Sequence, residues 1–266
     1  MEAADVQFAG SIPEFYDRCL GPFLFEPYAA DLARRARLLR PQRILETAAG
    51  TGIVTAALAR ALPDAEIVAT DLNPDMLRVA ESKPENRRVA FAPADAQALP
   101  FPDSGFDLVV CQFGAMFFPD RVGAYREARR VLRPGGAFLF NVWDRLEANP
   151  ASQAVAEAVA ELFPGDPPSF LGRVPFGYHD KAAVEADLRA AGFADVEAET
   201  VAARSRGDAG ALAPGLCQGS PLRSEIEARA PERLDEATEA ALSALVRRHG
   251  DPVDAAMSAH VFAARR

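Results

Sequence analysis

The sequence is poor in the residues that mark disulfide-rich, metal-binding and membrane-spanning proteins. Its three cysteines, Cys19, Cys111 and Cys217, are widely separated and odd in number, so neither a disulfide framework nor a pair of zinc ligands can be recognised. We expect them to be small buried hydrophobic side chains in a reducing compartment. Charged residues and prolines interrupt every apolar run, and the first residues lack the pattern of a secretory signal. We therefore expect a cytoplasmic protein with no membrane insertion and no bound metal.

An excess of positive charge is also missing. The 266 residues include 38 acidic and 29 basic side chains, which gives a net charge of −9. A phosphate backbone or an anionic lipid would meet a field of like sign, so nucleic acid is not an expected partner. Hydrophobic residues make up 49% of the chain and charged residues 25%, which excludes a disordered or collagen-like protein. The length fits one large α/β domain, or one domain that carries a lid.

Short apolar segments alternate with helical segments from about residue 43 onwards. We expect strands at residues 43–46, 66–70, 88–92, 106–111 and 137–142, and helices at residues 53–62, 74–80 and 120–132. The strands are apolar throughout, which is typical of parallel strands covered on both faces. The pattern therefore predicts an α/β fold in which helices cover both faces of a parallel sheet.

The flanking segments divide the chain into four parts. Residues 1–40 are expected to form a helical N-terminal cap, in which Gly21-Pro22 ends one helix and a second helix spans residues 23–39. Residues 41–143 form the core, and residues 144–180 form a lid rich in proline and glycine. Residues 181–266 complete the core fold with strands at 196–203 and 256–263, which a helical insertion at 204–250 separates.

Small residues connect the first strand to the following helix, in the sequence ILETAAGTG at 44–52. Glycines let a ligand approach the backbone closely, and the helix start offers unpaired N–H groups. A dinucleotide fingerprint would need a third small residue at position 55, where the chain has Thr55. Glu46 ends the strand with a carboxylate, which would repel a pyrophosphate and attract a cationic amino acid or a sulfonium. The loop therefore favours a positively charged nucleoside.

Five motifs, in this order, resemble a known family. They are ILETAAGTG (44–52), ATDLNPDML (69–77), ADAQALPF (94–101), FDLVV (106–110) and RVLRPGG (130–136). The chain resembles the class I S-adenosylmethionine-dependent methyltransferases, of the small-molecule type typified by the ubiquinone/menaquinone C-methyltransferases. The resemblance spans roughly residues 40–143, and the segments on either side match only in outline. It implies a Rossmann-like fold with a seven-stranded, mostly parallel sheet whose last strand is antiparallel.

The resemblance also implies S-adenosylmethionine as the cofactor and S-adenosylhomocysteine as the product. Asp71 would accept hydrogen bonds from the ribose hydroxyls, Met76 would pack on the adenine, and Asp95 would accept from the adenine amine. Glu46 would face the methionine amine, directly or through water. The cofactor-binding candidates are Glu46, Ala48, Gly50, Thr51, Gly52, Asp71, Leu72, Met76, Asp95, Ala96 and Gln112. Ala48 stands where relatives usually have glycine, and we expect its φ to be negative.

The methyl acceptor is expected to be a small, fairly apolar metabolite that is methylated at oxygen, nitrogen or carbon. Methyl transfer depends mainly on positioning, so no nucleophile motif is expected. His179 is the candidate general base, and Tyr16 is a candidate contact or, equally, a buried aromatic residue. Phe113, Phe117 and Trp143 follow the fourth and fifth strands, where they wall an acceptor pocket or serve only as core packing.

Two other functions stay open from the sequence alone. A nicotinamide-dependent dehydrogenase uses a similar loop, but Thr55 and Glu46 argue against it. A methyltransferase-like protein without catalysis would act as a partner module through residues 204–250. The sequence names neither the acceptor nor the attacked atom, and a homodimer is compatible with it.

Overall fold

Seven strands form one sheet that organises the chain. The computed structural model describes residues 12–266, so residues 1–11 of the expected cap lie outside the described residues. The strands are β1 (Arg43–Glu46), β2 (Glu66–Asp71), β3 (Ala90–Pro93), β4 (Phe106–Gln112), β5 (Leu132–Trp143), β6 (Asp195–Gly207) and β7 (Val253–Arg265). Their order is β3-β2-β1-β4-β5-β7-β6. β1 to β5 pair in parallel and β7 is antiparallel to both neighbours, which confirms the predicted sheet.

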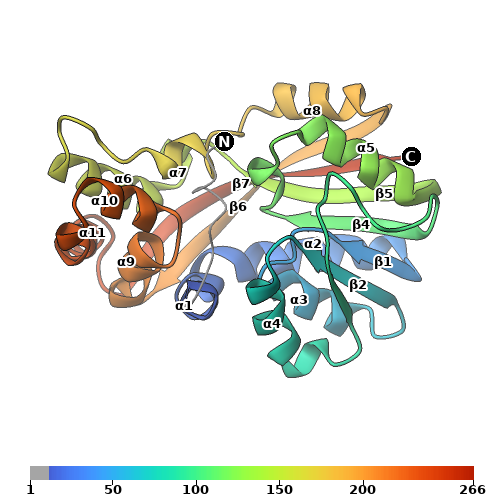
Figure 1. Cartoon of the computed structure of the whole chain (residues 1–266), viewed down its shortest axis with the longest axis horizontal. Helices are drawn as coiled ribbons and strands as arrows, with labels where there is room; N and C mark the ends of the chain where they lie inside the picture. The colour runs from blue at the N-terminus through green and yellow to red at the C-terminus, as the bar shows by residue number, and fades with distance from the viewer. Residues whose placement is uncertain (1–11) are drawn as a thin grey trace.

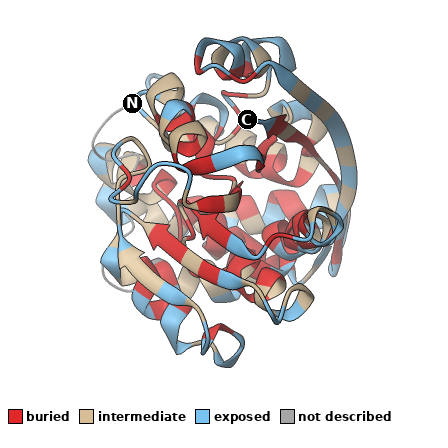
Figure 2. Cartoon of the chain, turned by 90° about the vertical axis from the view of Figure 1, so that its right-hand side faces the viewer, coloured by how far each residue is buried: buried red, intermediate tan, exposed pale blue. Residues whose placement is uncertain are grey.

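Helices cover both faces of this sheet (Figure 1). They are α1 (Ile12–Leu20), α2 (Glu26–Leu39), α3 (Ile53–Ala61), α4 (Pro74–Ser82), α5 (Arg121–Val131), α6 (Pro150–Leu162), α7 (Phe170–Arg173), α8 (Lys181–Ala190), α9 (Ala209–Gln218), α10 (Leu222–Arg229) and α11 (Leu234–His249). α2 and α3 bury alanines and leucines against Ile44 and Val110 on one face. α5 and α8 cover Phe138 and Phe262 on the other face. Figure 2 shows buried residues concentrated in the central strands and exposed residues on the outer sides of the helices, while the edge strand β6 is mostly exposed or intermediate.

Side-chain caps fix where several helices begin. Asn73 accepts the backbone N–H of Asp75 at 2.9 Å at the start of α4. The starts of α5, α8 and α9 are capped in the same way by aspartates, Asp120, Asp180 and Asp208. Such caps satisfy N–H groups that have no partner within the helix. At α4 the cap also fixes the path of the chain directly after Asp71, at the end of β2.

The N-terminal helices are continuous, although a break at Gly21-Pro22 was expected. Gly21–Phe25 forms a π-helical turn between α1 and α2. Pro22 has no N–H to donate and lies in the first turn of this segment, where the regular α-helical hydrogen-bond pattern is interrupted. Burial of Phe23, Leu24 and Phe25 stabilises the wider turn. The turn also brings Phe25 to the carboxyl end of the sheet, beside Gln112 of β4.

β6 and β7 extend past the rest of the sheet as a two-stranded ribbon. They pair over their whole length, whereas β5 pairs only with residues 259–265 of β7. The insertion therefore begins later than residue 204, because β6 continues to Gly207. α9, α10 and α11 occupy the connection between the two strands and gather with α6 and α7 at this end of the sheet (Figure 1).

No helix within residues 12–266 is long and apolar enough to cross a membrane. The three cysteines are free and buried, as expected. Burial raises the pKa of the Cys111 and Cys217 thiols to about 12, so both stay protonated near neutral pH.

Candidate functional site

Loops at the carboxyl ends of β1 to β4 surround a cavity of about 820 Å³. It lies beside β1 and β4, where the strand order reverses direction, which is the usual ligand position in open α/β sheets. Its size falls within the range of small-molecule and cofactor sites. The part of the lining that the structure describes contains two carboxylates, Asp71 and Asp95, and no basic side chain. The cavity therefore favours a cationic or neutral ligand over a pyrophosphate.

Most of the cofactor-binding candidates line this cavity. They are Ala48, Gly50, Thr51, Asp71, Leu72, Met76, Asp95, Ala96 and Gln112, with Phe113 and Phe117 from the acceptor candidates. Gly52 lies at the start of α3 instead, and Glu46 is buried beneath the loop. Sequence reasoning missed other lining residues, among them Phe25, Ile53, Val54, Gln97, Gly114 and Phe118. Gln97 and Gly114 closely follow the carboxyl ends of β3 and β4, and this position alone could have identified them as candidate lining residues.

Asp71 ties the loop after β1 to the end of β2. Gly50 donates its backbone N–H to Asp71 Oδ2 at 2.8 Å, and Asn73 donates its own to Oδ1 at 2.8 Å. Burial raises the pKa of Asp71, and these backbone N–H groups oppose the rise. A carboxylate oxygen has more than one lone pair, so both oxygens can still accept a ligand hydroxyl. A Cβ atom at Gly50 would meet no atom within 4 Å, so the loop borders open space at this point.

Ala48 has a φ of 51°, so the expectation of a negative φ is wrong. The loop turns through positive φ at Ala48, Gly50 and Gly52. An L side chain in this region is strained by roughly 1–2 kcal/mol, because its Cβ atom approaches a backbone carbonyl. The Ala48 methyl group faces Gly114, where a Cβ atom would lie 2.5 Å from Ala48 Cβ. The missing side chain at position 114 therefore leaves room for alanine at position 48.

Glu46 is fully buried and does not contribute to the cavity lining. Neither of its carboxylate oxygens has a hydrogen-bond partner among residues 12–266. Burial raises the pKa of Glu46 to about 8, while Thr55 and Lys83 oppose this rise and Asp71 adds to it. The carboxyl group is therefore mostly protonated at neutral pH. Its contact with a methionine amine stays a prediction.

The loops after β2 and β3 place apolar and polar groups in the same lining. Leu72 is 64% exposed, so a bound ligand can cover much of its side chain. Met76 of α4 is buried beside the cavity. Asp95 accepts the backbone N–H of Gln97 at 2.8 Å and its side-chain amide at 3.1 Å. These bonds orient the Asp95 carboxylate and leave it able to accept from a ligand amine.

A smaller, mostly apolar pocket of about 60 Å³ adjoins the cavity. The two spaces share four aromatic residues, Tyr16, Phe25, Phe113 and Phe117, which we call the aromatic wall. Trp143 lines the smaller pocket and stacks on Phe113 with ring centroids 3.9 Å apart. The three aromatic acceptor candidates therefore meet at this pocket. Its described lining contains no charged side chain.

Polar contacts hold the aromatic wall in place. Phe113 has a φ of 50° directly after β4, and its N–H donates to Asn141 Oδ1 of β5 at 2.9 Å. Gln112 donates its side-chain amide to the Phe25 carbonyl oxygen at 3.3 Å, which joins β4 to the π-helical turn. Backbone strain of this kind persists only where the surrounding structure over-determines it. Asn141 and Gln112 thus position the rings that separate the two spaces.

Tyr16 is the member of the aromatic wall that carries a hydroxyl group. Its ring stacks on Phe25 with centroids 5.1 Å apart. Burial and the nearby carboxylates of Asp71 and Asp17 raise its pKa well above the ordinary value. The phenol therefore keeps its proton at neutral pH, which suits it to orient a ligand as a donor rather than to remove a proton.

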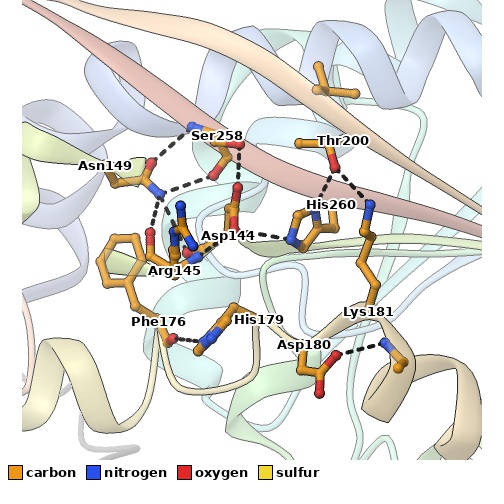
Figure 3. A network of polar contacts seen from close by, with 12 residues as sticks. Asp144, Arg145, Asn149, Phe176, His179, Asp180, Lys181, Thr200, Ser258 and His260 are labelled. Atoms are coloured by element: carbon orange, nitrogen blue, oxygen red, sulfur yellow. Dashed lines mark hydrogen bonds and ion pairs between the residues drawn. The ribbon is translucent and has the colours of Figure 1, made fainter. Parts of the chain in front are cut away.

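His179 does not contribute to the lining of the cavity or of the pocket. Its Nδ1 atom lies 2.8 Å from the Phe176 carbonyl oxygen. Figure 3 shows it beside a polar network in which Asp144 contacts Ser258 at 2.8 Å and His260 at 3.2 Å. The structure gives His179 no contact with either space, and its role as a base stays a prediction.

Asp17 links α1 to the loop after β1 through hydrogen bonds. Its Oδ1 atom accepts from Thr51 Oγ1 and from Lys83 Nζ, both at 2.6 Å. Thr51 belongs to the loop after β1 and Lys83 follows α4, so one carboxylate joins three segments. Sequence reasoning named Tyr16 and missed Asp17, although the adjacent position in the chain was an available signal.

The motifs around the cavity are shared with known proteins. A family model described as "Methyltransferase domain" matches residues 45–140. The chain is 44% identical over 117 residues to a demethylmenaquinone methyltransferase of Thermus thermophilus. This aligned segment covers 41% of this chain and 53% of that protein. It is 33% identical over 171 residues to a ubiquinone/menaquinone biosynthesis C-methyltransferase of Serratia proteamaculans, with coverage of 59% and 68%. The chain thus spans about half to two thirds of the length of these relatives.

Solved structures share the fold over nearly the whole chain. The [4+2]-cyclase SpnF has a TM-score of 0.63 and 20% identity, over 96% of this chain and 93% of that protein. The YcgJ protein of Bacillus subtilis has a TM-score of 0.58 and 21% identity, over 90% and 99%. These similarities show the fold alone. Because one of the two proteins is named as a cyclase, the fold does not specify the reaction.

Proposed function

The chain belongs to the class I S-adenosylmethionine-dependent methyltransferases, and we propose that it methylates a small, uncharged and mostly apolar molecule bound in the smaller pocket. The observation that carries this proposal is the presence of two spaces that share one aromatic wall. The larger space has carboxylates suited to a cationic nucleoside, and the smaller one has no charged side chain in its described lining. Donor and acceptor then meet at Tyr16, Phe25, Phe113 and Phe117.

The residues of the cavity fit S-adenosylmethionine, which supplies an electrophilic methyl group when it is bound. Asp71 would accept the ribose hydroxyls and Asp95 the adenine amine, while Ala96 would offer its backbone N–H to the ring. Leu72 and Met76 would contact the adenine faces. The open space at Gly50 and the acidic lining support this assignment, since both favour a bulky cationic nucleoside close to the loop.

The aromatic wall positions the acceptor and excludes water. Aromatic faces attract a cation, so Phe25 and Phe113 stabilise the positive charge that is present before transfer. Tyr16 borders both spaces and retains its proton, so it presents a neutral phenol there and does not act as a base. The rings of the aromatic wall would hold the acceptor atom beside the methyl group that bound S-adenosylmethionine supplies. Positioning of this kind supplies on the order of 7–11 kcal/mol of barrier reduction.

Calorimetric titration of the stripped protein with S-adenosylhomocysteine tests the donor half of the proposal, with NADH as the control. We expect micromolar binding of the first and none of the second. Tighter binding of NADH would instead support the dehydrogenase. Transfer of a labelled methyl group then separates an enzyme from a partner module that binds the cofactor without catalysis. Hydroquinones and phenols are the first acceptors to test, in view of the names of the sequence relatives. The cytoplasmic location and the homodimer stay predictions.

A further inference from the structure

Two serines line the smaller pocket, and their hydroxyl groups differ in what they contact. Ser220 precedes α10 and is buried; its Oγ atom donates to the Leu216 carbonyl oxygen at 2.6 Å and accepts the Leu222 N–H at 3.2 Å. Ser152 lies in the first turn of α6 and is only 3% exposed. Its hydroxyl forms no hydrogen bond with any residue in 12–266, yet it is not among the fully enclosed side-chain atoms that lack a partner. Ser152 therefore contributes an accessible hydroxyl with no protein partner among these residues to a pocket that is otherwise mostly apolar.

The Ser152 hydroxyl is available to whatever fills the pocket, because no group of the described residues engages it. Water can bond it before a ligand binds, and a bound molecule that displaces this water loses affinity unless it replaces the hydrogen bond. Ser152 lines the smaller pocket and not the cavity, so it lies on the pocket side of the aromatic wall, away from the loop that binds the donor. A polar atom on the occupant of the pocket would replace that bond.

We infer that Ser152 hydrogen-bonds a polar atom of the methyl acceptor and thereby selects acceptors with an uncharged ring that carries a hydroxyl or carbonyl oxygen. This inference rests on the proposed function, because it places the acceptor in the smaller pocket. The lining supports a neutral ring, since it is rich in aromatic residues and its described part carries no charge. Amines, carboxylates and phosphates would lose hydration there without gaining a counter-charge. Ser152 is thus a specificity-determining residue that contacts the acceptor at a position remote from the transferred methyl group.

Tryptophan fluorescence can report binding in this pocket. Its one tryptophan is Trp143, which lines the pocket, so quenching of its fluorescence reports on what binds there. The test uses p-cresol and p-xylene, which have nearly the same shape and differ by one hydroxyl group in place of a methyl group. Both are titrated into full-length protein, with and without saturating S-adenosylhomocysteine, with excitation at the red edge of indole absorption where cresol does not absorb.

We expect Ser152→Ala to weaken the binding of p-cresol by about five- to tenfold, the size of one lost hydrogen bond, and to leave p-xylene unchanged or slightly tighter. Ser220→Ala is the matched control: its hydroxyl is already engaged within the protein, so it should not alter the ratio of the two affinities. Circular dichroism and the melting temperature verify that each variant is folded. The Ser152→Ala variant should be close to the wild type in stability, because the hydroxyl makes no hydrogen bond within residues 12–266.

The outcomes separate this inference from the proposed function. One outcome is that Ser152→Ala changes the affinities for p-cresol and p-xylene by the same factor, or changes neither affinity. In either case Ser152 does not select the acceptor, and the proposed function is unaffected. If S-adenosylhomocysteine binds but neither probe quenches Trp143 in the wild type, the pocket is not an acceptor site and the inference is wrong. If S-adenosylhomocysteine fails to bind, the proposed function fails, and the inference that rests on it fails with it.

Discussion

At the scale of single residues, the cavity depends on pairs of positions that compensate each other. The methyl group of Ala48 occupies space that a side chain at position 114 would need, and both positions border the cavity. Phe113 tolerates a left-handed backbone because Asn141 accepts its N–H. In each pair, one residue carries the strain and the other makes it tolerable. Substitutions there should act through the partner as well as through the residue that is changed.

The pair of Ala48 and Gly114 can be tested by a double-mutant cycle. In Gly114→Ala, the new Cβ atom lies 2.5 Å from Ala48 Cβ and 2.8 Å from Cys111 Sγ, so we expect a destabilisation of about 1–3 kcal/mol. Adding Ala48→Gly should restore part of that loss, with a coupling energy of about 0.5–3 kcal/mol from urea denaturation. Gly165→Ala, where no atom lies within 4 Å, is the control and should change stability by less than about 0.5 kcal/mol. Additive effects of the pair would contradict the compensation.

Asp71 is the residue whose loss should affect the donor site most. Asp71→Ala removes the acceptor for two backbone N–H groups and, in the proposed site, for the ribose hydroxyls. We expect the dissociation constant for S-adenosylhomocysteine to rise at least tenfold, about 1.4 kcal/mol, in calorimetry. Asp64→Ala removes an exposed carboxylate in the loop before β2 and should leave the constant unchanged. An unaltered constant in Asp71→Ala would count heavily against the site as assigned.

At the scale of elements, the local patterns predicted the strands of the core well and the path of the connections poorly. The apolar run that forms β4 and the cap at Asn73 depend on neighbours in the chain, so the sequence alone suffices. Phe25 reaches the cavity through a π-helical turn, whereas the pattern of Gly21-Pro22 predicts the end of a helix. His179 was a candidate because of its residue type, yet its location depends on how residues 164–178 fold against the sheet. The positions of Phe25 and His179 depend on contacts between residues that are far apart in the sequence, which local patterns do not reveal.

Asp17 is the side chain that joins α1 to both the loop after β1 and the segment after α4. Asp17→Ala removes the acceptor for Thr51 and Lys83, which join α1 to the loop and to α4. We expect faster hydrogen exchange in residues 12–20 and weaker binding of S-adenosylhomocysteine, with a smaller change in global stability. Glu14→Ala breaks an ion pair with Arg78 in which both side chains are mostly exposed, so exchange should hardly change. Equal exchange in the two variants would show that Asp17 does not fasten α1.

At the scale of the whole molecule, the sheet encloses an acidic group that the folded state prefers to keep neutral. Glu46 is completely buried and lacks hydrogen-bond partners among the described residues, which raises its pKa to about 8 from an ordinary value of 4.5. In the unfolded chain the same group ionises near its ordinary value. The folded state therefore binds an additional proton between these two values, and its stability must depend on pH in that window.

The sign of this dependence follows from which state holds the proton. Because the folded pKa is raised, the contribution of Glu46 to stability is fully present below about pH 4.5 and is lost as the pH rises towards 8. Glu46→Gln cannot ionise, so the free energy of unfolding of the variant relative to the wild type should increase steadily over this range. Chemical denaturation at a series of pH values measures the slope, and a constant offset from the new amide does not affect it. A flat difference would mean that Glu46 is ionised in the folded protein.

The ribbon of β6 and β7 has a consequence for how such a chain can diversify. Residues of the described lining of the larger cavity all come from positions 16–119, whereas Leu216, Ser220 and Pro221 of the helical insertion help to line the smaller pocket. The insertion connects β6 to β7 at the end of the ribbon where these two strands pair with each other and β5 does not pair with β7. Substitutions within the insertion can therefore change part of the acceptor pocket without altering any residue of the larger cavity's described lining.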